Sequence, residues 1–132
     1  MSVKKIQTEE ECVIRAAEFG CEAFFATDYE VMVDLDYKNG RLAPLNIDVL
    51  AMFETNDYPV ISRLETTSKS GHGRHVYLRL GKAVDHMQRA LFQATLGSDP
   101  KREVFAVFGK QFSALYETPT EAERVKEWRK QL

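Results

Sequence analysis

The sequence predicts a single α+β domain over residues 1–132, with a central β-α-β-β-α-β order and one added helix at each end. Two observations predict this class. Apolar and polar residues alternate, as in half-buried strands, in three short segments: 30–37, 60–67 and 74–80. Residues 46–56 and 86–96 instead carry apolar residues at helical spacing, and each helix begins at a capping residue, Asn46 or Asp85. This order matches the ferredoxin-like split βαβ plan of palm and RNA-binding domains.

The remaining elements complete this plan around a palm-like core at 30–108. Thr8 and Glu11 form a capping-box pattern and predict an N-terminal helix over 8–20. Residues 101–108 fit a helix after Pro100 or the closing strand, because their periodicity favours neither. A C-terminal helix over 119–132 carries an apolar seam that includes Trp128, which packs on the domain or docks a partner. In the helix 86–96, the expected inward face comprises Met87, Ala90, Leu91 and Ala94.

Composition limits the classes of function. With 132 residues, 44% of them hydrophobic, the chain can bury a core of its own. The formal net charge of −2 gives no global attraction to nucleic acid or to an anionic membrane, so an anionic ligand needs a local basic patch. Cys12 and Cys21 are too few for a disulfide scaffold and lack zinc-site spacing. Because we find neither a membrane span nor a signal peptide, we expect a cytoplasmic protein without a membrane partner.

Two acidic residues end the first strand of the core. Asp34 and Asp36 are separated by one residue, so on a strand they project to the same side, roughly 6.5–7 Å apart along the chain. Like charges this close disfavour each other unless a cation lies between them. Carboxylate oxygens are ligands that Mg²⁺ prefers, so a divalent metal site is one interpretation. A solvated polar face of the strand is the other.

A small-residue turn joins the second and third strands. Ser70, Gly71 and Gly73 allow close approach of a ligand, and Lys69 and Arg74 supply positive charge. Hydroxyls, backbone N–H groups and cations within a few residues are typical of a phosphate-binding loop. An exposed hairpin turn with a solvated basic patch is the alternative. In the expected sheet the first and third strands are neighbours, which would bring this turn beside Asp34 and Asp36.

A single aspartate, Asp99, follows the second helix of the core and precedes Pro100. An aspartate before proline is an ordinary N-cap of a helix. Two-metal phosphoryl transfer also requires metal ions held by carboxylates beside cations that bind the phosphates, and Asp99 is the candidate third carboxylate.

Three motifs in order, VDLD, SGHGRHVYL and LGSDPKRE, resemble the signature of the archaeo-eukaryotic primase superfamily, particularly its phage and plasmid members. The resemblance covers roughly residues 30–105. It implies that Asp34, Asp36 and Asp99 are catalytic and bind Mg²⁺ or Mn²⁺. It also implies that four residues contact the phosphates of a nucleoside triphosphate: Ser70, His75, Lys69 and Arg74. Members of the superfamily make primers or extend strands on a DNA or RNA template.

The resemblance therefore implies a primase or polymerase-type nucleotidyltransferase of DNA replication, of phage, plasmid or bacterial origin. Members usually carry a second α/β module beside the palm, and only 29 residues precede the first core strand here. A minimal palm that needs a replication partner protein is the expected form. The main alternative is a non-catalytic ferredoxin-like module that binds nucleic acid, nucleotide or protein, which metal dependence would distinguish.

Two further classes fit the sequence poorly. A rolling-circle nuclease requires two histidines on one strand, and Tyr77 occupies the second position after His75. A zinc site built from His72, His75 and His86 lacks supporting cysteines, and His86 is expected on the surface of its helix.

Overall fold

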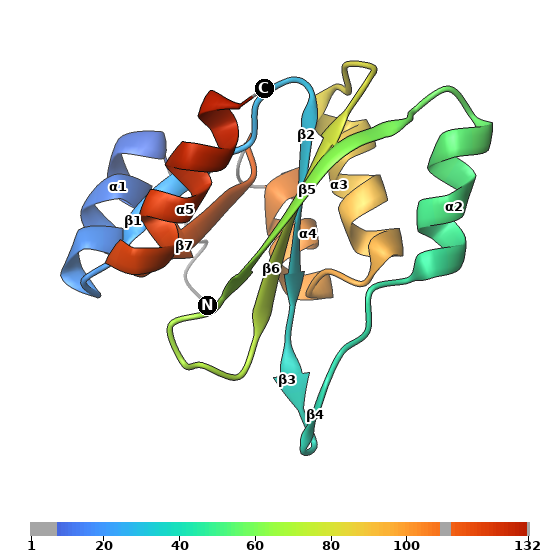
Figure 1. The fold of residues 1–132 in the computed structure, drawn as a ribbon. Coiled ribbons are helices and arrows are strands. Elements are labelled where there is room, and N and C mark those ends of the chain that lie inside the picture. Colours follow the sequence, from blue (N-terminus) through green and yellow to red (C-terminus); the bar gives the residue numbers. More distant parts are fainter. Residues whose placement is uncertain (1–7, 109–111, 132) are drawn as a thin grey trace.

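The computed structural model describes residues 8–108 and 112–131, which form an α+β fold of five helices and antiparallel sheets (Figure 1). The central sheet has the order β2-β6-β5 and contains β2 (Glu30–Leu35), β6 (Arg74–Leu80) and β5 (Val60–Thr67). Two smaller antiparallel pairs accompany this sheet. The first joins β1 (Glu22–Phe25) to β7 (Ala114–Glu117), and the second joins β3 (Tyr37–Lys38) to β4 (Arg41–Leu42).

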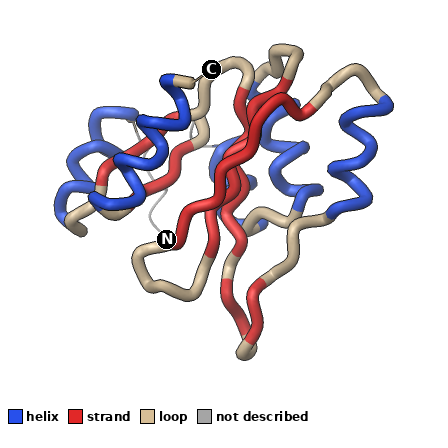
Figure 2. Tube along the Cα trace, viewed as in Figure 1, coloured by secondary structure: helices blue, strands red, loops and turns tan. Residues whose placement is uncertain are grey.

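Helices lie on both sides of the central sheet, as Figure 2 shows in blue. On one side lie α2 (Ile47–Thr55), α3 (His86–Leu96) and α4 (Pro100–Phe108), with α4 packed against α3. On the other side lie α1 (Glu9–Glu18), α5 (Pro119–Lys130) and the β1–β7 pair. Segments from the two ends of the chain therefore form one layer together. No helix in the described part of the chain is long and apolar enough to span a membrane.

Two hydrophobic cores share the central sheet, because alternate residues of each strand face opposite sides. The core under α2 and α3 takes its β2 residues from odd positions, with Val31, Val33 and Leu35. The core under α5 takes Met32 and Tyr77 from the sheet and Trp128 from α5. The indole Nε1 of Trp128 donates a hydrogen bond to Ser62 Oγ at 2.8 Å. Of the two alternatives for this residue, packing on its own domain is therefore the one observed.

The structure confirms most of the expected elements. The strands 60–67 and 74–80 and the helix 86–96 have the expected bounds, and the strand expected at 30–37 ends at Leu35. Asn46 and Thr8 cap their helices through side-chain oxygens, and Asp85 forms a full capping box with Gln88. Residues 100–108, which periodicity left open, are the helix α4. Leu132, expected in the C-terminal seam, lies outside the described residues.

The closing strand of the expected order does not join the central sheet. A strand does follow α4, but this strand, β7, pairs with β1. Within the described residues, the outer edge of β2 is covered by side chains instead. The N–H of Met32 donates to Gln93 Oε1 at 2.8 Å, and its C=O accepts from Arg102 Nη1 at 2.8 Å. Arg89 Nε likewise donates to the C=O of Glu30 at 2.9 Å. Because backbone polar groups must find partners when buried, these side chains replace a fourth strand.

This edge also explains why the expected inward face of α3 is wrong at three of its four positions. Ala90 is buried as expected, but Met87, Leu91 and Ala94 are exposed, and the other buried residues of the helix are Arg89, Gln93 and Leu96. Counting apolar residues misplaces the face because the edge of β2 requires polar partners. His86 differs from expectation too, since it is half-buried with Nε2 2.7 Å from the carbonyl oxygen of Ala106.

Candidate functional site

A pocket of about 860 Å³ lies where the end of β2, the β5–β6 turn, α4, β7 and α1 meet. Five of the seven site residues expected from the sequence line it: Asp34, Asp36, Lys69, Ser70 and His75. The lining also includes Arg15 of α1, Ser68 of the turn and Arg102 of α4. The pocket therefore gathers acidic and basic side chains from segments that are distant in the sequence.

Pairing of β2 with β6 brings the acidic motif beside the turn. In this antiparallel register Asp34 is the partner of His75, as expected for neighbouring first and third strands. The backbone of Asp34 is held on its other side by the residues that follow α3. Its N–H donates to Ser98 Oγ at 3.0 Å, and its C=O accepts from the N–H of Asp99 at 3.0 Å. The motif containing Asp99 thus fixes the position of the acidic strand end.

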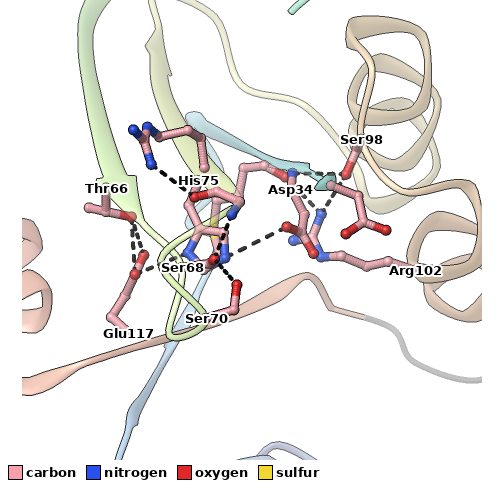
Figure 3. A network of polar contacts seen from close by, with 12 residues as sticks. Asp34, Thr66, Ser68, Ser70, His75, Ser98, Arg102 and Glu117 are labelled. Carbon is pink, nitrogen blue, oxygen red and sulfur yellow. Dashed lines mark hydrogen bonds and ion pairs between the residues drawn. The ribbon is translucent and has the colours of Figure 1, made fainter. Parts of the chain in front are cut away.

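The Asp34 carboxylate lies in a mixed electrostatic environment. Burial raises its pKa above the ordinary range, and the negative charges of Asp36 and Asp99 raise it further. His75 and Arg102 act in the opposite direction but do not reverse the shift. The Nε2 atom of His75 lies 3.6 Å from Asp34 Oδ1 (Figure 3). Burial, rather than repulsion between the acids, is therefore the main cause of the raised pKa of Asp34.

Asp36 and Asp99 are both partly exposed to solvent. Asp36 accepts a hydrogen bond from the N–H of Tyr37 at 3.0 Å and lies 3.5 Å from Lys38 Nζ. Asp99 caps α4, because its Oδ1 accepts from the N–H of Lys101 at 3.1 Å. Both acids line a second pocket of about 320 Å³ that adjoins the first one at Asp36.

Three carboxylates that influence one another are a suitable donor set for a hard divalent cation. Two of them, Asp34 and Asp36, line the same pocket. Over residues 8–108 and 112–131, no group of three or more acidic, histidine or cysteine side chains is arranged to hold a metal ion. The carboxylates are of the donor type that Mg²⁺ and Mn²⁺ prefer, but the described side chains are not arranged as a metal site, and Asp99 is engaged as a helix cap.

The β5–β6 turn is a compact loop closed by Ser68. Its Oγ accepts from the N–H of Gly73 at 2.9 Å and lies 3.0 Å from Ser70 Oγ. Gly71 has φ +82°, and a Cβ on Gly73 would lie 3.1 Å from the carbonyl oxygen of Leu35, so both positions favour glycine. The N–H groups of residues 71, 72 and 73 bond within the turn. The turn therefore offers a ligand mainly hydroxyl groups and cations, rather than free N–H groups.

The two basic residues expected to bind phosphates, Lys69 and Arg74, lie in different places. Lys69 lines the pocket, and its Nζ also donates to the carbonyl oxygen of Phe19 at the end of α1. Arg74 is not among the lining residues, because it follows the turn on the opposite face of β6. Its guanidinium donates to the carbonyl oxygen of Gly73 at 3.2 Å.

Sequence reasoning missed two residues that shape the site. Arg102 donates to Met32 O, to Ser98 Oγ and to the carbonyl oxygen of Ala114 in β7, so it joins β2, α4 and β7 beside Asp34. Glu117 of β7 is fully buried, and its Oε1 atom lies 3.0 Å from His75 Nδ1 (Figure 3). The sequence contains one indication of Glu117, an acidic residue in the short apolar segment ALYE, but Glu117 belongs to none of the three motifs.

Comparison with known proteins gives no relative from which to assign a function. No protein-family model matches the chain, and neither the curated proteins nor the solved structures include a match.

Proposed function

We propose that the protein is a metal-dependent nucleotidyltransferase of the primase or polymerase type, which adds nucleotides to a nucleic-acid strand in DNA replication. One observation carries the proposal. The acidic strand end and the small-residue turn, which lie more than 30 residues apart in the sequence, line the same open pocket. Phosphoryl transfer needs these two parts together, namely carboxylates for the metal and cations with hydroxyls for the phosphates.

Each residue has a defined role in this proposal. Asp34 and Asp36 are the principal metal ligands, and Asp99 is the third candidate. Bound Mg²⁺ or Mn²⁺ would supply charge neutralisation at the reacting phosphate and orient its oxygens. Lys69, Ser70 and His75 bind the phosphates of the incoming nucleoside triphosphate, because all three line the pocket beside the acids. For Arg74 the proposal requires the guanidinium to turn away from the carbonyl oxygen of Gly73.

The central β-α-β-β-α segment is proposed to be a ferredoxin-like palm of the archaeo-eukaryotic primase type. The β2-β6-β5 order and the position of Asp34 beside His75 support this proposal. The layer of α1, β1, β7 and α5 contributes Arg15 and part of β7 to the pocket wall. This small layer would help to hold the nucleotide, and a replication partner protein would supply the remaining template contacts.

Nucleotide incorporation into a primed DNA template, with Mn²⁺ or Mg²⁺ and candidate replication partners, tests the proposal. Asp34→Ala and Asp36→Ala should each lower incorporation by at least about 100-fold, because each removes a proposed metal ligand. Asp48→Ala, on the exposed side of α2, is the matched control and should keep full activity. Full activity in either pocket variant would exclude the mechanism.

A non-catalytic module that binds nucleotide or nucleic acid is the second candidate. The capping role of Asp99 and the contact between Asp36 and Lys38 favour it, because both contacts occupy carboxylates that catalysis would need for metal. Such a module would bind its ligand equally well in EDTA and would incorporate no nucleotide.

A further inference from the structure

A buried carboxylate lies behind the histidine of the pocket. Glu117 has no solvent exposure, and hydrogen-bond donors surround it. Thr66 Oγ1 donates to both of its oxygens, at 3.0 and 2.8 Å, and the Tyr77 hydroxyl donates to Oε2. The fourth contact is His75 Nδ1, 3.0 Å from Oε1. These donors come from two adjacent strands, β5 and β6, while Glu117 comes from β7.

These contacts determine the orientation of the His75 ring. An ionised Glu117 only accepts hydrogen bonds, and with this partner the Nδ1 atom of His75 that faces it carries the proton. The other ring nitrogen, Nε2, is then directed away from Glu117 and lies 3.6 Å from Asp34 Oδ1. Figure 3 shows the ring between Glu117 and Asp34. His75 itself is only 6% exposed and lines the pocket.

We propose that Glu117 is a positioning residue, which holds His75 so that Nε2 is the ring atom presented to the phosphates of a bound nucleotide, to which it donates a hydrogen bond when the ring is an imidazolium. This inference rests on the proposed function, in which His75 contacts those phosphates. A carboxylate that fixes the tautomer and direction of a functional histidine is the arrangement found behind histidines in hydrolase triads.

The position of Glu117 in β7 extends the inference to the fold. β7 pairs with β1 and reaches the central sheet through the Arg102 and Glu117 side chains. The layer formed by the two ends of the chain is thus connected to His75 through one carboxylate. Neutral side chains of similar shape would fill the same volume without fixing which nitrogen of His75 carries the proton.

The first test uses the unmodified protein and does not depend on any activity. The protein has three histidines, so ¹⁵N–¹H correlation spectra of its imidazole rings are simple, and His75→Gln identifies the His75 signals. We expect a protonated Nδ1 on His75 in the ligand-free protein. A neutral His75 with its proton on Nε2 would overturn the proposal, whatever the protein binds.

The second test measures affinity for a nucleoside triphosphate with Mn²⁺ by calorimetry. Glu117→Gln should weaken binding by about 10-fold or more, the size of loss seen when the partner behind a metal-binding histidine is removed. Thr66→Val is the matched control, because it removes a hydrogen bond to the same buried carboxylate and leaves the His75 contact intact. It should change the affinity by less than about 2-fold.

The outcomes separate this inference from the proposed function. Unchanged affinity in a folded Glu117→Gln protein would overturn the role of Glu117, and so would equal losses in both variants. If the wild-type protein binds no nucleotide, the proposed function fails, and the spectrum of His75 still decides whether Glu117 fixes the ring. If Glu117→Gln does not fold, the wild-type spectrum still decides whether Glu117 fixes the His75 ring.

Discussion

At the scale of single residues, the motif around Asp99 has a structural use that its sequence only partly indicates. The N–H of Asp99 and the hydroxyl of Ser98 hold the backbone of Asp34, while the Asp99 carboxylate caps α4. The capping interpretation of an aspartate before proline is therefore observed, and metal binding by Asp99 stays a prediction. The short segment Ser98–Asp99 therefore both caps α4 and holds the end of β2 at Asp34.

Asp34→Asn should remove an electrostatic cost to the stability of the fold. Because the pKa of Asp34 is raised on folding, ionised Asp34 lowers stability as pH increases from about 4 through the raised pKa. An uncharged amide removes this cost, so in EDTA the variant should have a Tm at pH 7 equal to or above that of the wild type. The two Tm values should converge at pH 3, where wild-type Asp34 is protonated. A lower Tm at pH 7 would show that the charge stabilises the fold.

At the scale of elements, polar side chains of α3 and α4 replace a strand. Gln93 is fully buried, accepts from the N–H of Met32 and donates to Glu103 and Ser113. A sequence pattern that assigns polar residues to solvent cannot reveal this, because the need for Gln93 arises from the open edge of β2, 61 residues away. Strands and helix caps depend on neighbouring residues, which is why their bounds were predicted.

Gln93→Leu should therefore destabilise the protein by about 2–3 kcal/mol, because it leaves the buried N–H of Met32 without its acceptor and removes one of the donors to the buried Glu103 of α4. Leu91→Gln, on the exposed face of the same helix, is the control and should cost less than about 0.5 kcal/mol. Urea unfolding followed by circular dichroism measures both. Equal costs would mean that the edge of β2 does not need this side chain.

The junction of α5 with β5 should make stability depend on pH. Burial alone would raise the pKa of Glu121, but hydrogen bonds from the N–H of Thr67 and from Arg124 outweigh it and lower the pKa. A lowered pKa stabilises the folded state above the ordinary glutamate pKa, and this contribution is lost as pH falls through the lowered value.

Glu121→Gln should accordingly cost about 1 kcal/mol at pH 7 and little at pH 3. Glu123→Gln, on the exposed side of the same helix, should cost less than about 0.5 kcal/mol at either pH. Urea unfolding at the two pH values provides the comparison. A constant difference between Glu121→Gln and the wild type would contradict the role of the ionised carboxylate.

At the scale of the whole molecule, the pocket forms where two layers meet. Asp34, Asp36 and the turn at Ser70 were predictable because each belongs to a local motif, and the pairing of neighbouring strands brings them together. Glu117 was not predictable, because it meets His75 only when the layer that contains β7 packs on the central sheet. Long-range contacts between isolated polar residues leave no periodic signal in a sequence.

The central claim is that the pocket between the two layers binds a nucleoside triphosphate through a metal held by Asp34 and Asp36 at the end of β2. Calorimetric titration of a nucleoside triphosphate into the protein, first with Mn²⁺ and then with EDTA, tests it most directly, with Asp36→Asn and the exposed control Asp48→Asn in parallel. We predict binding in Mn²⁺ for the wild type and Asp48→Asn, and at least about 10-fold weaker binding in EDTA or in Asp36→Asn. Equal affinity with and without metal, or no binding under either condition, would contradict the claim.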